Sequence, residues 1–276
     1  MTYINVRGVD HYYEWIKKPS NMIKPVMVFM HGWAGSGRYW QSTAEELLDS
    51  FDCLLYDMRG FGRSHVQSDL SYELTEYAED LAVLLNQLNL ERVYINAHSM
   101  GASIATLFLN RYPQKVEKAI LTCSGIFEYD EKAFAAFYKF GGLVVKFRPK
   151  WLGKIPLADR MFMARFLHSP IPKSERQAFL EDFINADYQA ALGTIFTSVS
   201  KEQAELMPQE FAKLTVPTLL IAGEYDIIIP AELGKKAADL NDQVELAIIP
   251  NTAHFPMLED AETYLAKVRD FLNTGF

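Results

Sequence analysis

The chain repeats short apolar runs that alternate with longer segments whose apolar residues recur every three or four positions. Residues 25–30 are apolar at every position, which is typical of a parallel strand covered on both faces. Similar runs predict further strands at residues 53–56, 93–95, 119–123, 216–222 and 244–249, and an aromatic run predicts an early edge strand at 12–16. Helical spacing predicts helices at residues 43–50, 75–88, 102–109 and 260–273. This alternation predicts an α/β fold with a mostly parallel sheet.

The alternation stops between residues 126 and 208. This stretch has two helix-like segments, 130–147 and 174–200, separated by a proline-bearing stretch, and no convincing strand. We therefore predict a core made of residues 1–125 and 209–276, with residues 126–208 forming an all-helical insertion.

One junction between a strand and a helix carries a candidate nucleophile. The run 93–95 passes into the helix-favouring run 102–109 through only a few residues, with Ser99 at the apex. The flanking positions are small, Ala97 and Gly101, so strand and helix can approach closely. Such a turn exposes the Ser99 hydroxyl beside the free N–H groups at the start of the following helix.

This junction resembles the nucleophile elbow of the α/β-hydrolase superfamily, with Ala97 in place of the first glycine of G-x-S-x-G. Four further segments resemble motifs of the same superfamily: His-Gly-Trp at 31–33, the D-x-R-G-x-G-x-S loop at 57–64, Gly-Glu-Tyr-Asp at 223–226 and the histidine loop at 251–259. The resemblance implies an α/β-hydrolase fold with a mostly parallel sheet, flanked by helices, and a helical cap inserted after the sixth strand.

The same resemblance assigns roles to individual residues. Ser99 is the expected nucleophile, Asp226 the acid and His254 the base, in the chain order that this superfamily uses. The backbone N–H groups of Trp33 and Met100 are the expected oxyanion hole. Glu224 is the alternative acid.

This arrangement implies a serine hydrolase that cleaves small-molecule carboxylic esters through an acyl-enzyme. One alternative is a carbon–carbon bond hydrolase of the meta-cleavage type, although such enzymes usually carry Trp after the histidine and this chain has Phe255. A second alternative is a ligand receptor of the same fold with little turnover.

Composition excludes other classes of protein. The chain has 276 residues, a net charge of −8 and a pI of about 5.3, so nucleic-acid binding is not expected.

The two cysteines, Cys53 and Cys123, lie in apolar runs and are expected to be buried free thiols. The absence of a signal-like start and of a long apolar run predicts a soluble, cytoplasmic protein. The remaining histidines show no paired ligand spacing, so we expect no metal; they are His11, His31, His65, His98 and His168. The glycine-rich loop after residue 30 lacks a phosphate-binding motif, so we expect no cofactor.

The predicted cap differs in charge from the rest of the chain. Residues 146–173 contain seven Lys and Arg against one acid, Asp159. The cap region 126–208 also holds 14 of the 36 aromatic residues. A solvated basic face is the simpler interpretation, and contact with an anionic membrane surface is the alternative. Some of the aromatic rings are expected to form an apolar acyl pocket under the cap.

Overall fold

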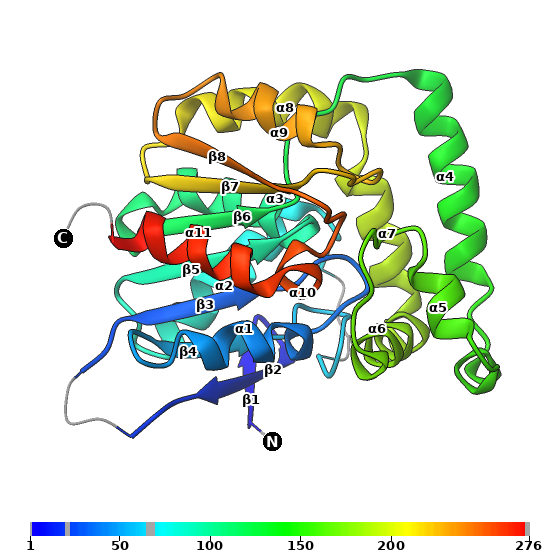
Figure 1. Ribbon diagram of the computed structural model, residues 1–276, viewed down its shortest axis with the longest axis horizontal. Coiled ribbons are helices and arrows are strands. Elements are labelled where there is room, and N and C mark those ends of the chain that lie inside the picture. Colours follow the sequence, from blue (N-terminus) through cyan, green and yellow to red (C-terminus); the bar gives the residue numbers. More distant parts are fainter. Residues whose placement is uncertain (1, 20–22, 65–69, 274–276) are drawn as a thin grey trace.

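The computed structural model describes residues 2–19, 23–64 and 70–273, which form an eight-stranded sheet between layers of helices (Figure 1). The strand order is β1-β2-β4-β3-β5-β6-β7-β8, and all neighbours from β4 to β8 are parallel. The strands are β1 (Thr2–Val6), β2 (Val9–Ile16), β3 (Val26–Met30), β4 (Asp52–Tyr56), β5 (Val93–His98), β6 (Val116–Thr122), β7 (Thr218–Gly223) and β8 (Val244–Ile249). The predicted fold class is therefore confirmed.

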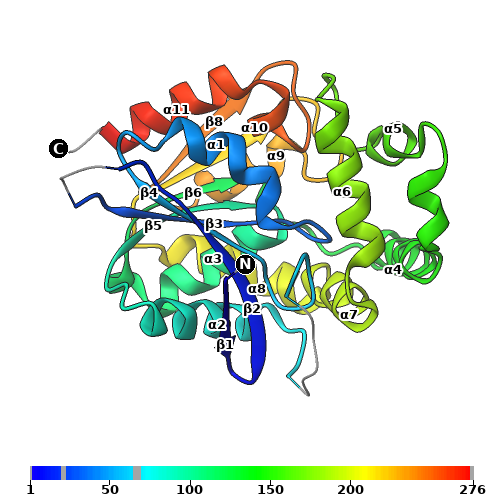
Figure 2. The same cartoon turned by 90° about the horizontal axis from the view of Figure 1, so that it is seen from below.

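Both faces of the sheet are covered by amphipathic helices, so the parallel strands are buried on both sides (Figure 2). One face is covered by α2 (Leu74–Gln87), α3 (Met100–Arg111), α8 (Lys201–Lys213) and α9 (Ala231–Ala238). The opposite face is covered by α1 (Gln41–Glu46) and α11 (Ala261–Asn273).

The beginning of the chain differs from the sequence prediction. The strand expected at residues 12–16 as an edge is the longer β2, which pairs antiparallel with β1 on one side and β4 on the other. The edge is β1, a strand of mixed polarity and largely exposed side chains. The prediction was wrong because a strand with little buried surface has a weak apolar pattern.

The helical insertion follows β6, as predicted, and lies at one end of the sheet (Figures 1 and 2). It contains α4 (Glu131–Lys146), η3 (Lys150–Lys154), α5 (Ala158–Met163), α6 (Lys173–Asn185) and α7 (Tyr188–Ser198). The expected helical segment 174–200 is broken between α6 and α7, where the Asp187 side chain caps α7 by accepting from the Ala190 N–H at 2.9 Å. The predicted boundary at residue 208 lies inside α8, and the division into core and cap stays a prediction.

The insertion is attached to the loop that follows β3. Asp182 of α6 accepts from the Ser36 hydroxyl at 2.7 Å and forms an ion pair with Arg38 at 2.7 Å. Burial raises the pKa of Asp182 to about 6, while Arg38 and Ser36 act in the opposite direction. The Trp33 indole N–H donates to the Ala191 carbonyl of α7 at 3.0 Å. The insertion therefore packs directly on the loop that carries a predicted oxyanion donor.

The two cysteines were expected to be buried free thiols. Cys53 and Cys123 are both free and buried, as predicted. Burial raises the pKa of the Cys53 thiol to about 12, so this thiol is protonated at neutral pH. None of the described helices has the length and apolar character needed to cross a membrane.

Candidate active site

Ser99 lies at a strained turn between β5 and α3. Its backbone has φ 53° and ψ −121°, a conformation that is costly for a residue with a side chain. The Ser99 N–H donates to the Thr122 carbonyl of the neighbouring strand at 2.8 Å, which holds the turn against the sheet. A β-carbon at Gly101 would lie 2.4 Å from the His31 carbonyl oxygen, so glycine is required there for the close approach to β3.

The side chain of His254 lies within hydrogen-bond distance of Ser99 on one side and of Asp226 on the other. His254 Nε2 is 3.1 Å from Ser99 Oγ, and His254 Nδ1 is 2.7 Å from Asp226 Oδ2. A carboxylate can only accept, so Nδ1 carries a proton, and in the tautomer with that single ring proton Nε2 is an acceptor for the serine hydroxyl. The three residues come from loops after β5, β7 and β8, which end at the same edge of the sheet.

The surroundings of Asp226 keep it ionised. Burial by itself would raise the pKa of this carboxyl, but the charge and hydrogen bond of His254 and two backbone N–H groups outweigh it and lower the pKa. The two N–H groups belong to Ile228 and Ile229 and donate to Asp226 Oδ1 at 2.8 and 3.0 Å. The other candidate acid, Glu224, is exposed and accepts from the Asn251 N–H at 3.0 Å instead. The geometry therefore favours Asp226 over Glu224 as the partner of His254.

The two predicted oxyanion donors lie beside Ser99. Met100 is the first residue of α3, where a backbone N–H has no acceptor within the helix. A β-carbon at Gly32 would lie 3.1 Å from Ser99 Cβ, which brings the loop carrying Trp33 against the turn. Among the described residues, neither the Trp33 nor the Met100 N–H has an acceptor. Both N–H groups are thus without a described protein acceptor near the Ser99 turn, and their role as oxyanion donors stays a prediction.

A chain of buried hydrogen bonds connects the Gly32 loop, the Ser99 turn and the His254 loop. The sequence did not predict these bonds. His98 Nε2 is 2.7 Å from the His254 carbonyl oxygen and must donate to it. Burial, together with the nearby charge of His254, lowers the pKa of His98 well below its usual range, so the ring is neutral and its Nδ1 accepts from the Tyr39 hydroxyl at 2.9 Å. The Tyr39 oxygen in turn accepts from the Gly32 N–H at 2.5 Å. The buried chain holds the Gly32 loop, the Ser99 turn and the His254 loop in one arrangement.

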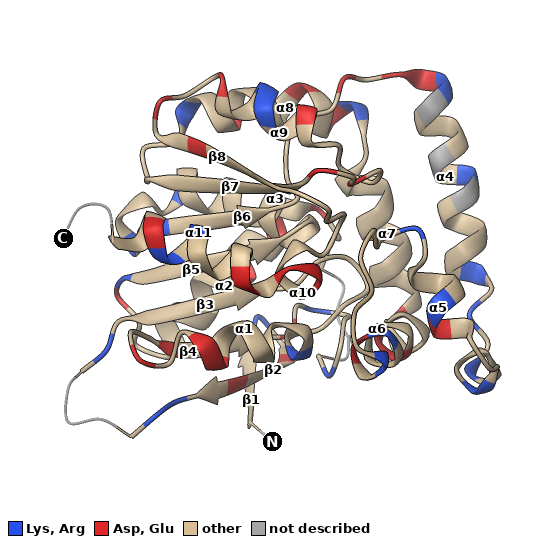
Figure 3. Cartoon of the chain, in the orientation of Figure 1, with Lys and Arg blue, Asp and Glu red and all other residues tan. Residues whose placement is uncertain are grey.

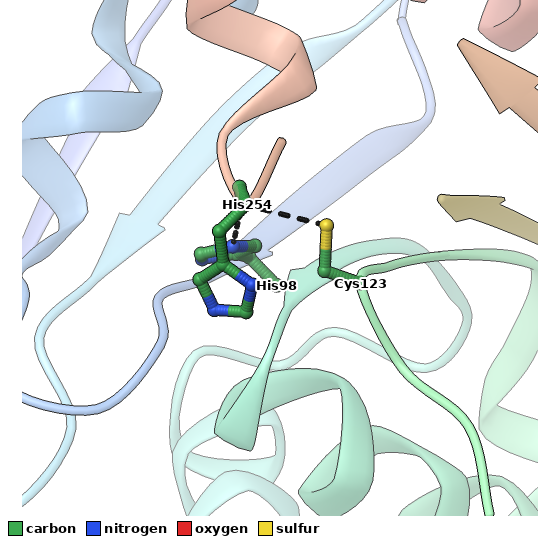
Figure 4. Close-up of side chains that lie close together, drawn as sticks. All are labelled: His98, Cys123 and His254. Carbon is green, nitrogen blue, oxygen red and sulfur yellow. Dashed lines mark hydrogen bonds between the residues drawn. The ribbon is translucent and has the colours of Figure 1, made fainter. Parts of the chain in front are cut away.

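His98, Cys123 and His254 bring possible metal-ligand atoms within 4.8 Å of one another (Figure 4). Both ring nitrogens of His98 and both of His254 already have protein partners, and the Cys123 thiol lies 3.4 Å from the His254 carbonyl oxygen. The arrangement is thus explained by hydrogen bonds, and we assign no metal to it. His65, considered with the other histidines, lies outside the described residues.

Glu259 joins the helical insertion to the histidine loop, and the sequence did not single it out. Its Oε2 accepts from the backbone N–H groups of His168 and Ser169 at 2.7 and 2.8 Å. Its Oε1 accepts from the N–H groups of Ala253 and Phe255 at 2.9 and 3.2 Å. One carboxylate therefore bridges the segment after α5 and both neighbours of His254.

The Glu259 bridge predicts that Glu259→Gln will affect both stability and turnover. An amide group offers only one acceptor oxygen, and its NH₂ would face two backbone donors. Because charged hydrogen bonds each contribute roughly 1.5–3 kcal/mol, we expect the free energy of unfolding to fall by about 2 kcal/mol. We expect kcat for the reaction at this site to fall about 10-fold, since His254 would be held less firmly. Urea unfolding and steady-state kinetics measure the two effects. The exposed Glu262→Gln is the matched control, and equal behaviour of the two variants would contradict the bridge.

Residues 25–261 match the sequence profile of the alpha/beta hydrolase fold family, and the chain belongs to this family. A Bacillus subtilis protein named "Uncharacterized hydrolase YugF" is 26% identical over 97% of this chain and 96% of its own length. "Proline iminopeptidase" of Heyndrickxia coagulans is 25% identical over 91% of each chain. The solved structure of an esterase from Exiguobacterium antarcticum superposes with a TM-score of 0.83 at 20% identity, and the match covers 99% of both chains, which shows the same fold. The family and these relatives support hydrolase activity.

Proposed function

We propose that the protein hydrolyses carboxylic esters by acyl transfer from Ser99 to water. The observation that carries the proposal is the 3.1 Å contact between Ser99 Oγ and His254 Nε2 at a strained turn, with Asp226 holding the opposite nitrogen of the ring. A base that accepts the hydroxyl proton and a carboxylate that orients the base are what nucleophilic serine chemistry requires.

In the proposed reaction His254 Nε2 takes the Ser99 proton as the serine oxygen attacks the ester carbonyl. The N–H groups of Trp33 and Met100 stabilise the negative charge that develops on the carbonyl oxygen. His254 then gives its proton to the leaving alcohol. A water molecule, deprotonated by His254, attacks the acyl-enzyme and releases the acid, which restores the Ser99 hydroxyl.

A row of aromatic rings next to the site supports an apolar acyl pocket. The ring of Phe166 lies 6.1 Å from that of His254, and Phe166 lies 5.9 Å from Phe162. Phe162 stacks on Phe183 at 4.6 Å, and Phe183 contacts Trp33 at 5.9 Å. The rings therefore extend from the proposed base to the loop of a proposed oxyanion donor, and Phe162 and Phe166 are only partly buried. An acyl chain placed along them would lose contact with water.

The acyl pocket predicts a preference for medium-length or aromatic acyl groups. Each buried methylene contributes up to about 0.8 kcal/mol, so kcat/KM for such p-nitrophenyl esters should exceed that for the acetate about 10-fold or more. Phe166→Ala should reduce the preference. Phe147→Ala is the matched control because that ring is exposed on the outside of the insertion. A strict preference for acetate would contradict the pocket.

The same assay, run beside a vinylogous diketone, separates the proposal from its two alternatives. Sustained turnover of esters supports the esterase. Faster cleavage of the diketone would instead identify a carbon–carbon bond hydrolase, and a single burst of product without further turnover would identify a receptor.

A further inference from the structure

Large apolar side chains gather on the outer edge of the helical insertion. Of the fifteen exposed large apolar side chains among the described residues, six lie between residues 143 and 161, with exposed fractions of 42 to 77%. We call this surface the cap ridge, and it consists of Leu143, Phe147, Trp151, Ile155, Leu157 and Met161. Most other exposed apolar residues are spread along the chain, as is usual for a soluble protein. The cap ridge is thus a local concentration.

The residues of the cap ridge come from consecutive elements. Leu143 and Phe147 lie one turn apart at the end of α4, and the Phe147 ring contacts that of Trp151 in η3 at 6.2 Å. Leu157 and Met161 are one turn apart at the start of α5. The end of α4, η3 and α5 lie on the side of the insertion that faces away from the sheet (Figures 1 and 2). The cap ridge therefore contributes nothing to the core of the domain.

The backbone conformation of Leu157 is unfavourable for leucine, so local backbone preference does not explain why an apolar residue occupies this position. Its φ is +65°, in the left-handed region that favours glycine or asparagine, and its side chain is 64% exposed. Burial of the side chain would offset the backbone strain, but this side chain is not buried. A binding role for the side chain would explain why an exposed leucine occupies this strained position.

Exposed basic residues surround the cap ridge. Lys146, Lys150, Lys154 and Arg160 are exposed, and within the described part of the chain none of them pairs with an acid. The acid within this stretch, Asp159, is buried and bound to Arg176 at 3.0 Å. Figure 3 shows Lys and Arg positions at the lower end of α4, on α5 and along the chain between these two helices. This surface is positive although the whole chain has a net charge of −8.

A cavity of about 280 Å³ opens beside the ridge and combines the same two chemistries. Its lining includes the apolar side chains of Val145, Phe147 and Ile184 together with Lys146 and Arg148. Arg148 is half-buried, and its guanidinium donates to the Phe183 carbonyl at 2.7 Å, which fixes the position of the charge. A cationic group fixed beside apolar walls suits an amphiphile with an anionic head.

We propose that the cap ridge docks the protein on an anionic lipid surface. The apolar side chains enter the boundary between headgroups and acyl chains, and Lys146, Lys150, Lys154 and Arg160 contact lipid phosphates. A symmetric contact between two copies of the chain would bring these basic residues against one another, which disfavours a second copy as the occupant. The docking is independent of the proposed ester hydrolysis.

Sedimentation with vesicles tests the proposal on the intact chain. The protein should bind vesicles of phosphatidylcholine mixed with phosphatidylglycerol, should bind phosphatidylcholine alone much less, and should be released by high salt. A triple variant, Lys146→Glu, Lys150→Glu and Lys154→Glu, should lose roughly 100-fold or more in vesicle affinity, since each basic residue contributes about fivefold. Phe147→Ser should lose about 10-fold. Lys235→Glu and Leu240→Ser, exposed on the core, are the matched controls.

Tryptophan fluorescence gives an independent measure of where the ridge lies. Trp151 is 53% exposed, and lipids brominated in the acyl chain should quench its emission upon binding. Trp151→Phe should remove that quenching while vesicle binding persists. Turnover of a soluble ester should be the same in all these variants, which shows that they are folded. Absence of binding to the anionic vesicles, or equal binding by the triple variant, would overturn the proposal, as would a dimer that Phe147→Ser dissociates without any vesicle binding.

Discussion

Ser99→Ala is expected to lower kcat for ester hydrolysis by roughly 10⁶, the loss seen when a serine nucleophile of this kind is removed. The methyl group cannot form the acyl-enzyme, and His254 then has no hydroxyl to deprotonate. Alanine carries the same β-carbon at the strained turn, so the thermal unfolding midpoint should stay near that of the parent protein. Steady-state kinetics with a p-nitrophenyl ester, together with a thermal melt, measure both quantities.

Ser103→Ala is the matched control for this prediction. Ser103 lies one turn later on the same helix, is half-buried, and should tolerate the change with little loss of kcat. A fluorophosphonate should label the parent protein at Ser99, and the Ser99→Ala variant should not react. An adduct found by mass spectrometry on another residue would exclude Ser99 as the nucleophile.

Asp226→Asn should lower kcat by roughly 10⁴. The carboxylate at 2.7 Å keeps the proton of His254 on Nδ1 and leaves Nε2 free to accept from Ser99. An asparagine amide can donate to Nδ1 and so favours the tautomer with the proton on Nε2. That tautomer cannot take the serine proton, although the ring stays in place.

Glu224→Gln is the control for Asp226→Asn, because Glu224 lies two residues earlier in the same loop and its carboxylate contacts the Asn251 N–H instead of His254. We expect Glu224→Gln to keep most of the activity in the same kinetic assay. A larger loss in Glu224→Gln than in Asp226→Asn would assign the acid role to Glu224.

The helical insertion and the candidate site are mechanically connected at two places. Asp182 and Ala191 of the insertion bind the loop after β3, and Glu259 binds the segment at 168–169 next to the His254 loop. Movement of the insertion would therefore disturb the proposed oxyanion donor and the proposed base together. We expect changes at Glu259 to act on kcat more than on KM for this reason.

Much of the fold could be predicted from the sequence because its signals are local. Strands buried on both faces are apolar at each position, and the strands expected at residues 25–30, 53–56 and 244–249 match β3, β4 and β8 within one residue at each end. The turn at Ser99 was visible because a strand runs into a helix there between two small residues, Ala97 and Gly101. The loops that carry Asp226 and His254 each follow a strand, so their arrival at one edge of the sheet follows from parallel pairing.

Other features of the site were invisible because they depend on partners far apart in the sequence. Nothing near Tyr39 indicates that its hydroxyl meets His98, 59 positions away. Glu259 was part of the recognised histidine loop, but its contacts with His168 and Ser169 depend on how the insertion folds back, 90 residues earlier in the chain. The break between α6 and α7 was missed because Asp187 acts as a cap only once the local chain direction is set.

The sequence by itself determined the α/β alternation, the helical insertion after β6 and the order of Ser99, Asp226 and His254, because backbone preference and apolar periodicity act over a few residues. Only the tertiary structure decided which carboxylate reaches His254, which aromatic rings line the site and which face solvent. Residues 146–173 show the difference: Phe166 points to His254 whereas Phe147 and Trp151 are exposed. Composition cannot separate these rings, because burial depends on how the helices dock against one another and on the sheet.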